Sequence, residues 1–215
     1  LSLDQDRTGT KYSLFCTATL IAPRVVATAA HCVHEMKLYV QENGPFMTFA
    51  FGEAAGAPRV PAYVRLIYED PKYDPLDPEY ATKELFAHDF ALLVLEEPVT
   101  GVEPAKIATA DPAQVHLGLG YGRTVSGPHD LMEDGPPKRK SIEMRLNGGS
   151  AETHYEVDPY GGSVCYGDSG GPLLEVAEDG SAKVVGVLSY MFNQDPEVAC
   201  LPRTRAAYSS YVAEK

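Results

Sequence analysis

The stretch CYGDSGGPLL, residues 165–174, places an acid and a serine side by side among three glycines and ends in a proline and two leucines. Glycine and proline punctuate loops in every fold, so this stretch predicts at least a tight turn. It also fits a nucleophile, because a serine without bulky neighbours leaves its hydroxyl accessible and backbone N–H groups free to face a substrate. The rest of the chain decides between these two interpretations.

The composition describes an acidic, globular chain. Its 215 residues are 44% hydrophobic and 22% charged, which favours a packed core over disorder. The formal net charge of -12 argues against a nucleic-acid partner, because phosphate binding uses clustered lysine and arginine. The one tight basic run, 138–140, fits a solvated loop edge. No apolar run approaches the roughly 20 residues that span a bilayer, so we expect no membrane partner.

Short runs of aromatic and β-branched residues between glycines and prolines dominate the chain, and no long segment has a strong helical period. Many short strands with such turns predict an all-β barrel or sandwich. The segment 96–105 follows the most apolar run and is the expected linker between two halves. The predicted strands are 12–21, 24–29, 37–40, 47–51, 63–68, 90–95, 141–146, 172–176 and 183–192.

A nucleophilic serine needs a base within hydrogen-bond reach and an acid that orients the base. His31 follows the small and β-branched residues of VVATAAHC, which let an imidazole stand clear of the backbone. Asp89 stands at the mouth of the apolar run FALLVL, where a carboxylate must be paired. Each also has a plainer interpretation, a structural histidine and a turn-capping aspartate. His88 is a competing imidazole that lacks the small neighbours of His31.

Three motifs in one order decide the matter. TAAHC around His31, DFALLVL from Asp89 and GDSGGPL around Ser169 make the chain resemble the chymotrypsin/trypsin-like serine proteases over nearly its whole length. The resemblance implies two antiparallel β-barrels with the active site in the cleft between them, which we expect in residues 1–100 and 101–215. It also implies a secreted serine endopeptidase that acts on proteins or peptides without a cofactor or metal, and we assume a monomer.

The order of these residues excludes two other hydrolase classes. GDSGG also satisfies the nucleophile elbow of α/β-hydrolases, but in those enzymes the histidine follows the serine. Here all six histidines precede Ser169. The subtilisin order of acid, histidine and serine also fails, because only Asp4 and Asp6 precede His31 and no parallel α/β pattern is present.

The resemblance assigns roles to the motif residues. His31 is expected to be the general base and then the general acid, Asp89 to orient its imidazole, and Ser169 to form the acyl-enzyme. The backbone N–H groups of Gly167 and Ser169 are expected to form the oxyanion hole. Asp168 matches the acid that pairs with the free N-terminal amine of mature family members.

The specificity pocket follows from the same resemblance. Ser189 is expected to hydrogen-bond Asp89, and the segment formed by Ser189, Tyr190 and Met191 to pair with the substrate backbone. Ser163 lies where the base of the pocket is expected. An uncharged base argues against a preference for lysine or arginine, and Met191 is expected to narrow the pocket.

The four cysteines allow three pairings, and His31-Cys32-x-His34 hints at a zinc site. No Cys-x-x-Cys supports zinc, so we expect no metal. The resemblance implies the disulfides Cys16–Cys32 and Cys165–Cys200.

Three features depart from the family pattern. The chain begins inside the position where the free N-terminus is expected, and we expect both family termini to lie outside the given sequence. The segment 70–88 looks like an insertion, either a solvated proline-rich loop or an acidic loop for cationic subsites or calcium. The basic loop 132–140 could be a processing site. The alternative to an active protease is a zymogen-like or inactive homologue that acts as a binding or regulatory module.

Overall fold

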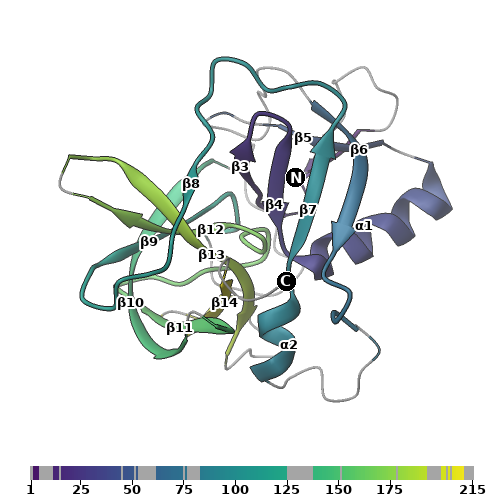
Figure 1. Ribbon diagram of the computed structural model, residues 1–215. Helices are drawn as coiled ribbons and strands as arrows, with labels where there is room; N and C mark the ends of the chain where they lie inside the picture. Colours follow the sequence, from purple (N-terminus) through teal and green to yellow (C-terminus); the bar gives the residue numbers. More distant parts are fainter. Residues whose placement is uncertain are drawn as a thin grey trace.

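The strands that the structure describes form two sheets of seven strands each, one from each half of the chain (Figure 1). The prediction of an all-β protein is therefore confirmed. The computed structural model describes residues 2–4, 12–14, 16–44, 46–50, 52, 62–74, 76, 83–124, 138–150, 152–177, 179–192, 200–201, 203 and 205–210.

The first sheet is antiparallel, with β2 and β3 at its edges among the described strands. In chain order its members are β1 (Ser2–Asp4), β2 (Tyr12–Leu14), β3 (Thr19–Ala22), β4 (Val25–Thr28), β5 (Phe46–Phe49), β6 (Ala62–Glu69) and β7 (Ala91–Leu95), and they pair in the order β2-β1-β5-β6-β7-β4-β3. The buried side chains on β4 and β7 form one core with the first turns of α1 (Ala30–Asn43), the helix that follows β4. This core includes Val26, Leu93 and Leu95.

The second sheet closes on itself, because β12 pairs with β13 as well as with β9. Its members are β8 (Lys106–Ile107), β9 (His116–Gly120), β10 (Lys140–Gly149), β11 (His154–Pro159), β12 (Pro172–Val176), β13 (Ala182–Met191) and β14 (Ala206–Ser210). They pair in the order β12-β9-β10-β11-β14-β13-β8, and β8 lies parallel to β13 outside the closed ring. The predicted barrel is thus closed in this half, whereas the described strands of the first half form an open order.

The expected linker, 96–105, runs between β7 and β8. It is held against the first sheet rather than hanging free, because Val99 N–H donates to the Pro23 carbonyl at 2.8 Å and Ala105 N–H to the Leu20 carbonyl at 2.9 Å. The two sheets consequently lie side by side (Figure 1).

One predicted strand, 37–40, is wrong because it lies inside α1 (Ala30–Asn43). Val33 and Met36 are fully buried against the first core and Val40 is partly buried there. These positions are three and four residues apart, which places them on one face of a helix. Leu38 and Tyr39, which suggested a strand, face solvent. The predicted strand 12–21 is also interrupted, because β2 ends at Leu14 and β3 begins at Thr19.

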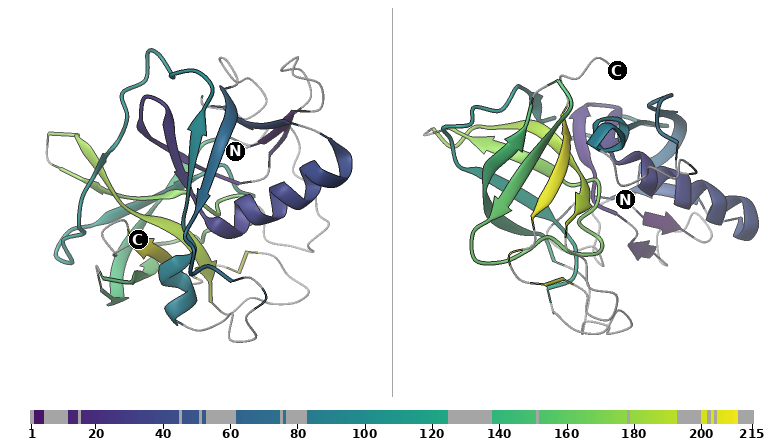
Figure 2. Two further views of the ribbon diagram at one scale, coloured as in Figure 1. Left: turned by 45° about the vertical axis from the view of Figure 1, so that its right-hand side comes forward. Right: turned by 90° about the horizontal axis from the view of Figure 1, so that it is seen from below.

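The end of segment 70–88 is not the solvated loop that was the plainer expectation. Residues 83–88 form α2 (Lys83–His88), which packs against β11 and β14 at the junction of the two halves (Figure 2). Phe86 and Ala87 are buried, and Asp70 is buried as well. Phe86 and Ala87 provide apolar surface that can be buried, which a proline-rich, acidic loop would lack. Neither described helix is long and apolar enough to cross a membrane.

Buried His116 on β9 should make the protein less stable in acid. Burial lowers the pKa of this imidazole, and the nearby carboxylates of Glu175 and Asp111 oppose the shift only in part. Below about pH 6.5 the unfolded chain takes up a proton that the folded protein resists, so acid favours unfolding. Urea unfolding at pH 7.5 and pH 5 should show that the free energy of unfolding drops more between these pH values for wild type than for His116→Leu. An equal loss in both proteins would contradict this assignment.

Candidate active site

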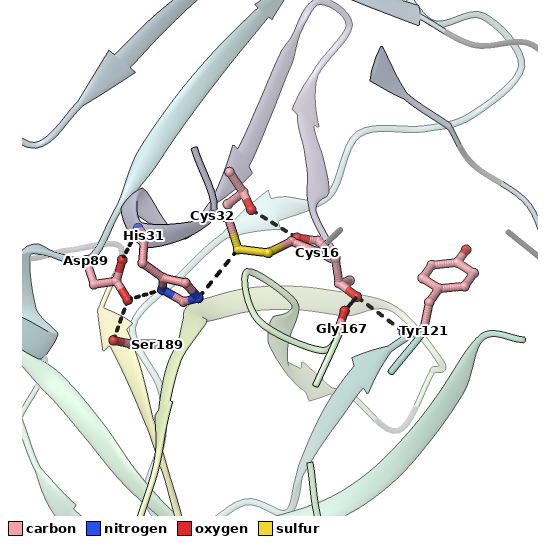
Figure 3. The surroundings of a disulfide bond; sticks show 9 residues. Cys16, His31, Cys32, Asp89, Tyr121, Gly167 and Ser189 are labelled. Carbon is pink, nitrogen blue, oxygen red and sulfur yellow. Dashed lines mark hydrogen bonds and ion pairs between the residues drawn. A yellow bond between two sulfur atoms is a disulfide. The ribbon is translucent and has the colours of Figure 1, made fainter. Parts of the chain in front are cut away.

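His31 and Asp89 are brought together by the pairing of β4 with β7. Thr28 at the end of β4 is the partner of Ala91 at the start of β7, so the residues that follow one strand meet those that precede the other. His31 lies in the first turn of α1, behind the small, fully buried Ala29 and Ala30. The compact Ala-Ala step brings the helix start against the strand end, which turns the imidazole toward Asp89 (Figure 3).

The carboxylate of Asp89 accepts three hydrogen bonds. His31 Nδ1 donates to Oδ2 at 2.7 Å, the His31 backbone N–H donates to Oδ1 at 2.8 Å, and Ser189 Oγ donates to Oδ2 at 2.7 Å (Figure 3). Burial alone would raise the pKa of this carboxyl, but the charge of His31 and these hydrogen bonds outweigh burial and hold the pKa below its ordinary value. Asp89 is therefore a buried carboxylate that stays ionised.

The imidazole of His31 is shifted in the opposite sense. Burial alone would lower its pKa, but the charge and hydrogen bond of Asp89, with a smaller effect of Glu35, outweigh burial and raise it. With Nδ1 donating to Asp89, Nε2 of the neutral ring is the unprotonated nitrogen and can accept a proton. Nε2 lies 3.6 Å from Cys32 Sγ (Figure 3).

The turn that carries Ser169 comes from the second half but is attached to the first. Thr17 N–H donates to the Ser169 carbonyl, and Thr17 Oγ1 donates to the Gly167 carbonyl, both at 2.8 Å. Gly170 has φ +78, and a Cβ there would overlap Thr28 Oγ1 and the Thr17 carbonyl oxygen. A glycine is therefore required for this close approach of the two halves.

Two backbone donors on this turn have no hydrogen-bond partner among the residues that the structure describes. Asp168 N–H donates to the Cys165 carbonyl at 3.0 Å and Gly170 N–H to the Leu188 carbonyl at 2.8 Å. Within the described part of the chain, no hydrogen bond is formed by the N–H groups of Gly167 and Ser169, and none joins the Ser169 hydroxyl to His31. Hydrogen bonds of this kind are often long in unliganded sites and tighten when substrate binds.

The Asp168 carboxylate is held by backbone N–H groups, a feature that sequence reasoning missed. Gly122 N–H donates to Oδ1 at 2.7 Å and Cys165 N–H donates to Oδ2 at 2.8 Å. Gly120 and Gly122 leave room for it, because a Cβ at either position would overlap this carboxylate. The signal was the glycine alternation in GLGYG, 118–122, which is unusual within and just after a strand.

Substituting Gly120 should therefore damage the Ser169 turn from a distance. In Gly120→Ala the new methyl group overlaps Asp168 Oδ1, so the aspartate and the turn that follows it must shift. We expect kcat for peptide hydrolysis to fall by at least about 100-fold, the scale of a misplaced catalytic group. Gly148→Ala on β10 is the matched control, since its Cβ would meet nothing closer than 3.4 Å. Equal activity of both variants would show that Asp168 has room to move.

Both predicted disulfides are confirmed, Cys16–Cys32 and Cys165–Cys200, and none of the cysteines is free. The first bridge fixes the start of α1 behind His31. Among the described residues, the one group of three possible metal ligands is Cys16, His31 and Cys32, and its two sulfurs already form the disulfide. The zinc site that His31-Cys32-x-His34 hinted at therefore has no thiolate from Cys32.

The residues expected around the pocket lie near the Ser169 turn. Ser163 is half-buried, donates to the Val164 carbonyl at 3.0 Å, and lines a cavity of ≈ 490 Å³ together with Asp168. Met191 pairs with Ala206 and packs against the core of the second half. Tyr190 stacks on Phe86 of α2 with ring centroids 5.0 Å apart, a contact that sequence reasoning missed because Phe86 lies in the supposed loop.

Comparisons with known proteins define the class first. Among solved structures, the chain is similar to neuropsin, a serine protease expressed in the limbic system of mouse brain, at a TM-score of 0.64 and 21% identity over 98% of this chain and 88% of that one. This likeness shows the chymotrypsin-like fold. The protein thus has the fold of the chymotrypsin-like serine proteases.

The family follows from the sequence comparisons. The model of the trypsin family matches residues 3–208, so the chain belongs to the trypsin family of serine proteases. Similar proteins include glandular kallikrein of Sus scrofa, 27% identical over 76% of this chain and 72% of the relative, and chymotrypsin-C of Rattus norvegicus, 28% identical over 93% and 77%. Membership of this family implies protein or peptide substrates.

Proposed function

We propose that the protein is an active serine endopeptidase in which Ser169 is the nucleophile, His31 the general base and Asp89 the group that orients the base. One observation carries the proposal. A continuous chain of hydrogen bonds runs from Ser189 through Asp89 to His31, and leaves His31 Nε2 free to accept a proton. Burying a charged carboxylate costs desolvation free energy even when hydrogen bonds compensate it, so a role in orienting His31 accounts for Asp89 better than a contribution to stability.

The chemistry follows from these groups. His31 Nε2 takes the proton of the Ser169 hydroxyl as its oxygen attacks the peptide carbonyl, and later gives that proton to the leaving amine. Ionised Asp89 stabilises the imidazolium that forms in between. The free N–H groups of Gly167 and Ser169 donate to the oxygen on which negative charge develops, and one such donor is typically worth about 3–4 kcal/mol in the transition state. In the second half of the reaction His31 takes a proton from water as the water oxygen attacks the acyl carbonyl. It then gives that proton to the Ser169 oxygen as the carboxylic acid product leaves.

The preferred substrate side chain before the scissile bond is uncharged and of small or medium size. Ser163 offers a hydroxyl but no carboxylate to a lysine or arginine, and a buried cation without a partner is costly. We infer from the resemblance that Met191, whose side chain packs on the core of the second half, narrows the pocket. Ser189, Tyr190 and Met191 present an extended backbone to which a substrate adds as a strand.

A peptide library that varies this one position tests the proposal. Wild type should cleave after small and medium apolar residues, with kcat/KM for lysine or arginine lower by at least about 100-fold. Met191→Gly should raise kcat/KM for large aromatic residues by about tenfold, and Met191→Leu, which preserves volume, should not. Cleavage only after lysine or arginine would overturn the proposed preference, and folded wild type without any hydrolysis would overturn the proposed activity.

We also propose the setting in which the enzyme works. Two disulfides suit an oxidising compartment, so the site of action is extracellular. The two halves, 1–100 and 101–215, act as two units with the catalytic groups at their junction. The protein works as a monomer on protein or peptide substrates, and its net charge of -12 disfavours nucleic acid as a partner.

A further inference from the structure

Asp89 lies at the centre of an unusually tight turn. The Phe90 N–H donates to the His88 carbonyl at 2.7 Å, which closes a three-residue γ-turn around Asp89. The turn links the end of α2 to the start of β7. One hydrogen bond between residues two positions apart does not by itself fix the direction of the central side chain, so other contacts must hold the two ends.

A single residue, Asp70, holds both ends. Its backbone N–H donates to the Phe90 carbonyl at 3.0 Å, and its Oδ2 accepts a hydrogen bond from His88 Nδ1 at 2.9 Å. Asp70 follows β6 directly, so the turn is clamped to the strand next to β7. A second anchor comes from the other half, where Ser209 Oγ lies 3.2 Å from the Asp89 carbonyl oxygen.

The clamp is itself well determined. The Asp70 side chain is 1% exposed, and its other oxygen, Oδ1, accepts the Lys72 N–H at 3.0 Å. The Asp70 carbonyl accepts the Tyr73 N–H, also at 3.0 Å. A buried carboxylate needs partners of this kind. Among the described residues that bond the Asp70 carboxylate, His88 is the one that belongs to the γ-turn. Removing either side chain frees the His88 end of the turn while the backbone bond to Phe90 stays.

From this arrangement we infer that Asp70, acting through His88, is a positioning residue that fixes the direction of the Asp89 carboxylate toward His31. The inference rests on the proposed function, because it gives the second histidine–aspartate pair a role in the orientation of the first. The pair does not touch substrate. Its loss should slow the chemical step and leave substrate binding in place.

The first test separates turnover from binding. Asp70→Ala and His88→Ala should each lower kcat for a good peptide substrate by about tenfold or more, with KM changed by no more than about twofold. His88→Asn is the rescue variant, because its side-chain NH₂ can take the place of His88 Nδ1 as the donor to Asp70. His88→Asn should therefore keep at least about half of the wild-type kcat, because the turn around Asp89 stays in place. Asp158→Ala on β11 removes a carboxylate that, among the described residues, accepts a side-chain hydrogen bond from Asn147 on the neighbouring β10, and it should leave kcat unchanged.

The second test does not need turnover. The pKa of His31, followed by NMR, depends on an Asp89 carboxylate held 2.7 Å from Nδ1, while Glu35 is untouched by these variants. It should fall in His88→Ala and in Asp70→Ala and stay near the wild-type value in His88→Asn. If Asp70→Ala fails to fold, the two His88 variants decide.

The outcomes separate the two claims. Inactive wild type with these pKa changes would sink the proposed activity and keep the positioning role. Two results with an active wild type would overturn the positioning role. One is that kcat and the pKa of His31 are unchanged in His88→Ala. The other is that both quantities are lowered equally in His88→Ala and His88→Asn.

Discussion

Ser169→Ala is expected to lower kcat for peptide hydrolysis by about a million-fold, the loss typical of removing the nucleophile from a serine–histidine–aspartate site. The substitution deletes one oxygen and leaves the turn intact, because the Ser169 backbone bond to Thr17 does not involve the side chain. Substrate binding should therefore persist. The measurement is kcat and KM on the best library peptide, with binding of a product peptide followed separately.

Ser181→Ala is the matched control for this change. Ser181 is exposed in the turn before β13, where its backbone contacts Asp179. Its loss should leave kcat and KM as they are. The activity that remains after loss of a nucleophile is far below about one per cent of wild-type kcat. If Ser169→Ala kept more than that, another group would be attacking the carbonyl.

Asp89→Asn is the second large effect, a loss of about 10,000-fold in kcat. The amide removes the charge that stabilises the imidazolium and places an NH₂ group where His31 and Ser189 both donate. His31 must be neutral to act as a base, and Asp89 raises its pKa against the effect of burial. Wild-type kcat/KM should therefore fall as pH drops through a value above 6.5, the ordinary pKa of histidine.

The pH profile gives this prediction its sharpest form. In Asp89→Asn the pKa of His31 should drop, so the acid limb of the residual activity should move to lower pH. Asp158→Asn, a carboxylate change on β11, should shift neither the limb nor kcat. An acid limb that stays in place in Asp89→Asn would mean that His31 does not titrate against Asp89 during turnover.

The sequence sufficed for the candidate site because its chemistry is written in short local stretches. TAAHC spans the end of β4 and the start of α1, DFALLVL runs into β7 and GDSGGPL runs into β12. Each motif is thus local, and their order excludes the other serine hydrolases considered. The same holds for strands such as β12, whose predicted range of 172–176 matches the structure. Local patterns of apolar and turn-forming residues are what short strands require.

Features that depend on distant contacts were out of reach. Thr17 holds the Gly167 carbonyl although the two are 150 positions apart, and nothing near Thr17 marks it for that role. Asp70 and His88 lie at the two ends of a segment whose prolines and acids suggest a solvated loop, and only the packing of Phe86 turns its end into α2. By contrast, α1 could have been predicted from the sequence, because Val33, Met36 and Val40 repeat at helical spacing. The β-branched and aromatic residues beside them suggested a strand instead.

The most direct test of the central claim is labelling with a fluorophosphonate probe, with wild type and Ser169→Ala side by side. The probe bonds to a serine only where a base activates it and an oxyanion hole is formed, so it reports both halves of the site at once. We predict one adduct per wild-type molecule by intact mass, located on Ser169 by peptide mapping, and none in the variant. Folded wild type that stays unlabelled, or an adduct on another residue, would contradict the account.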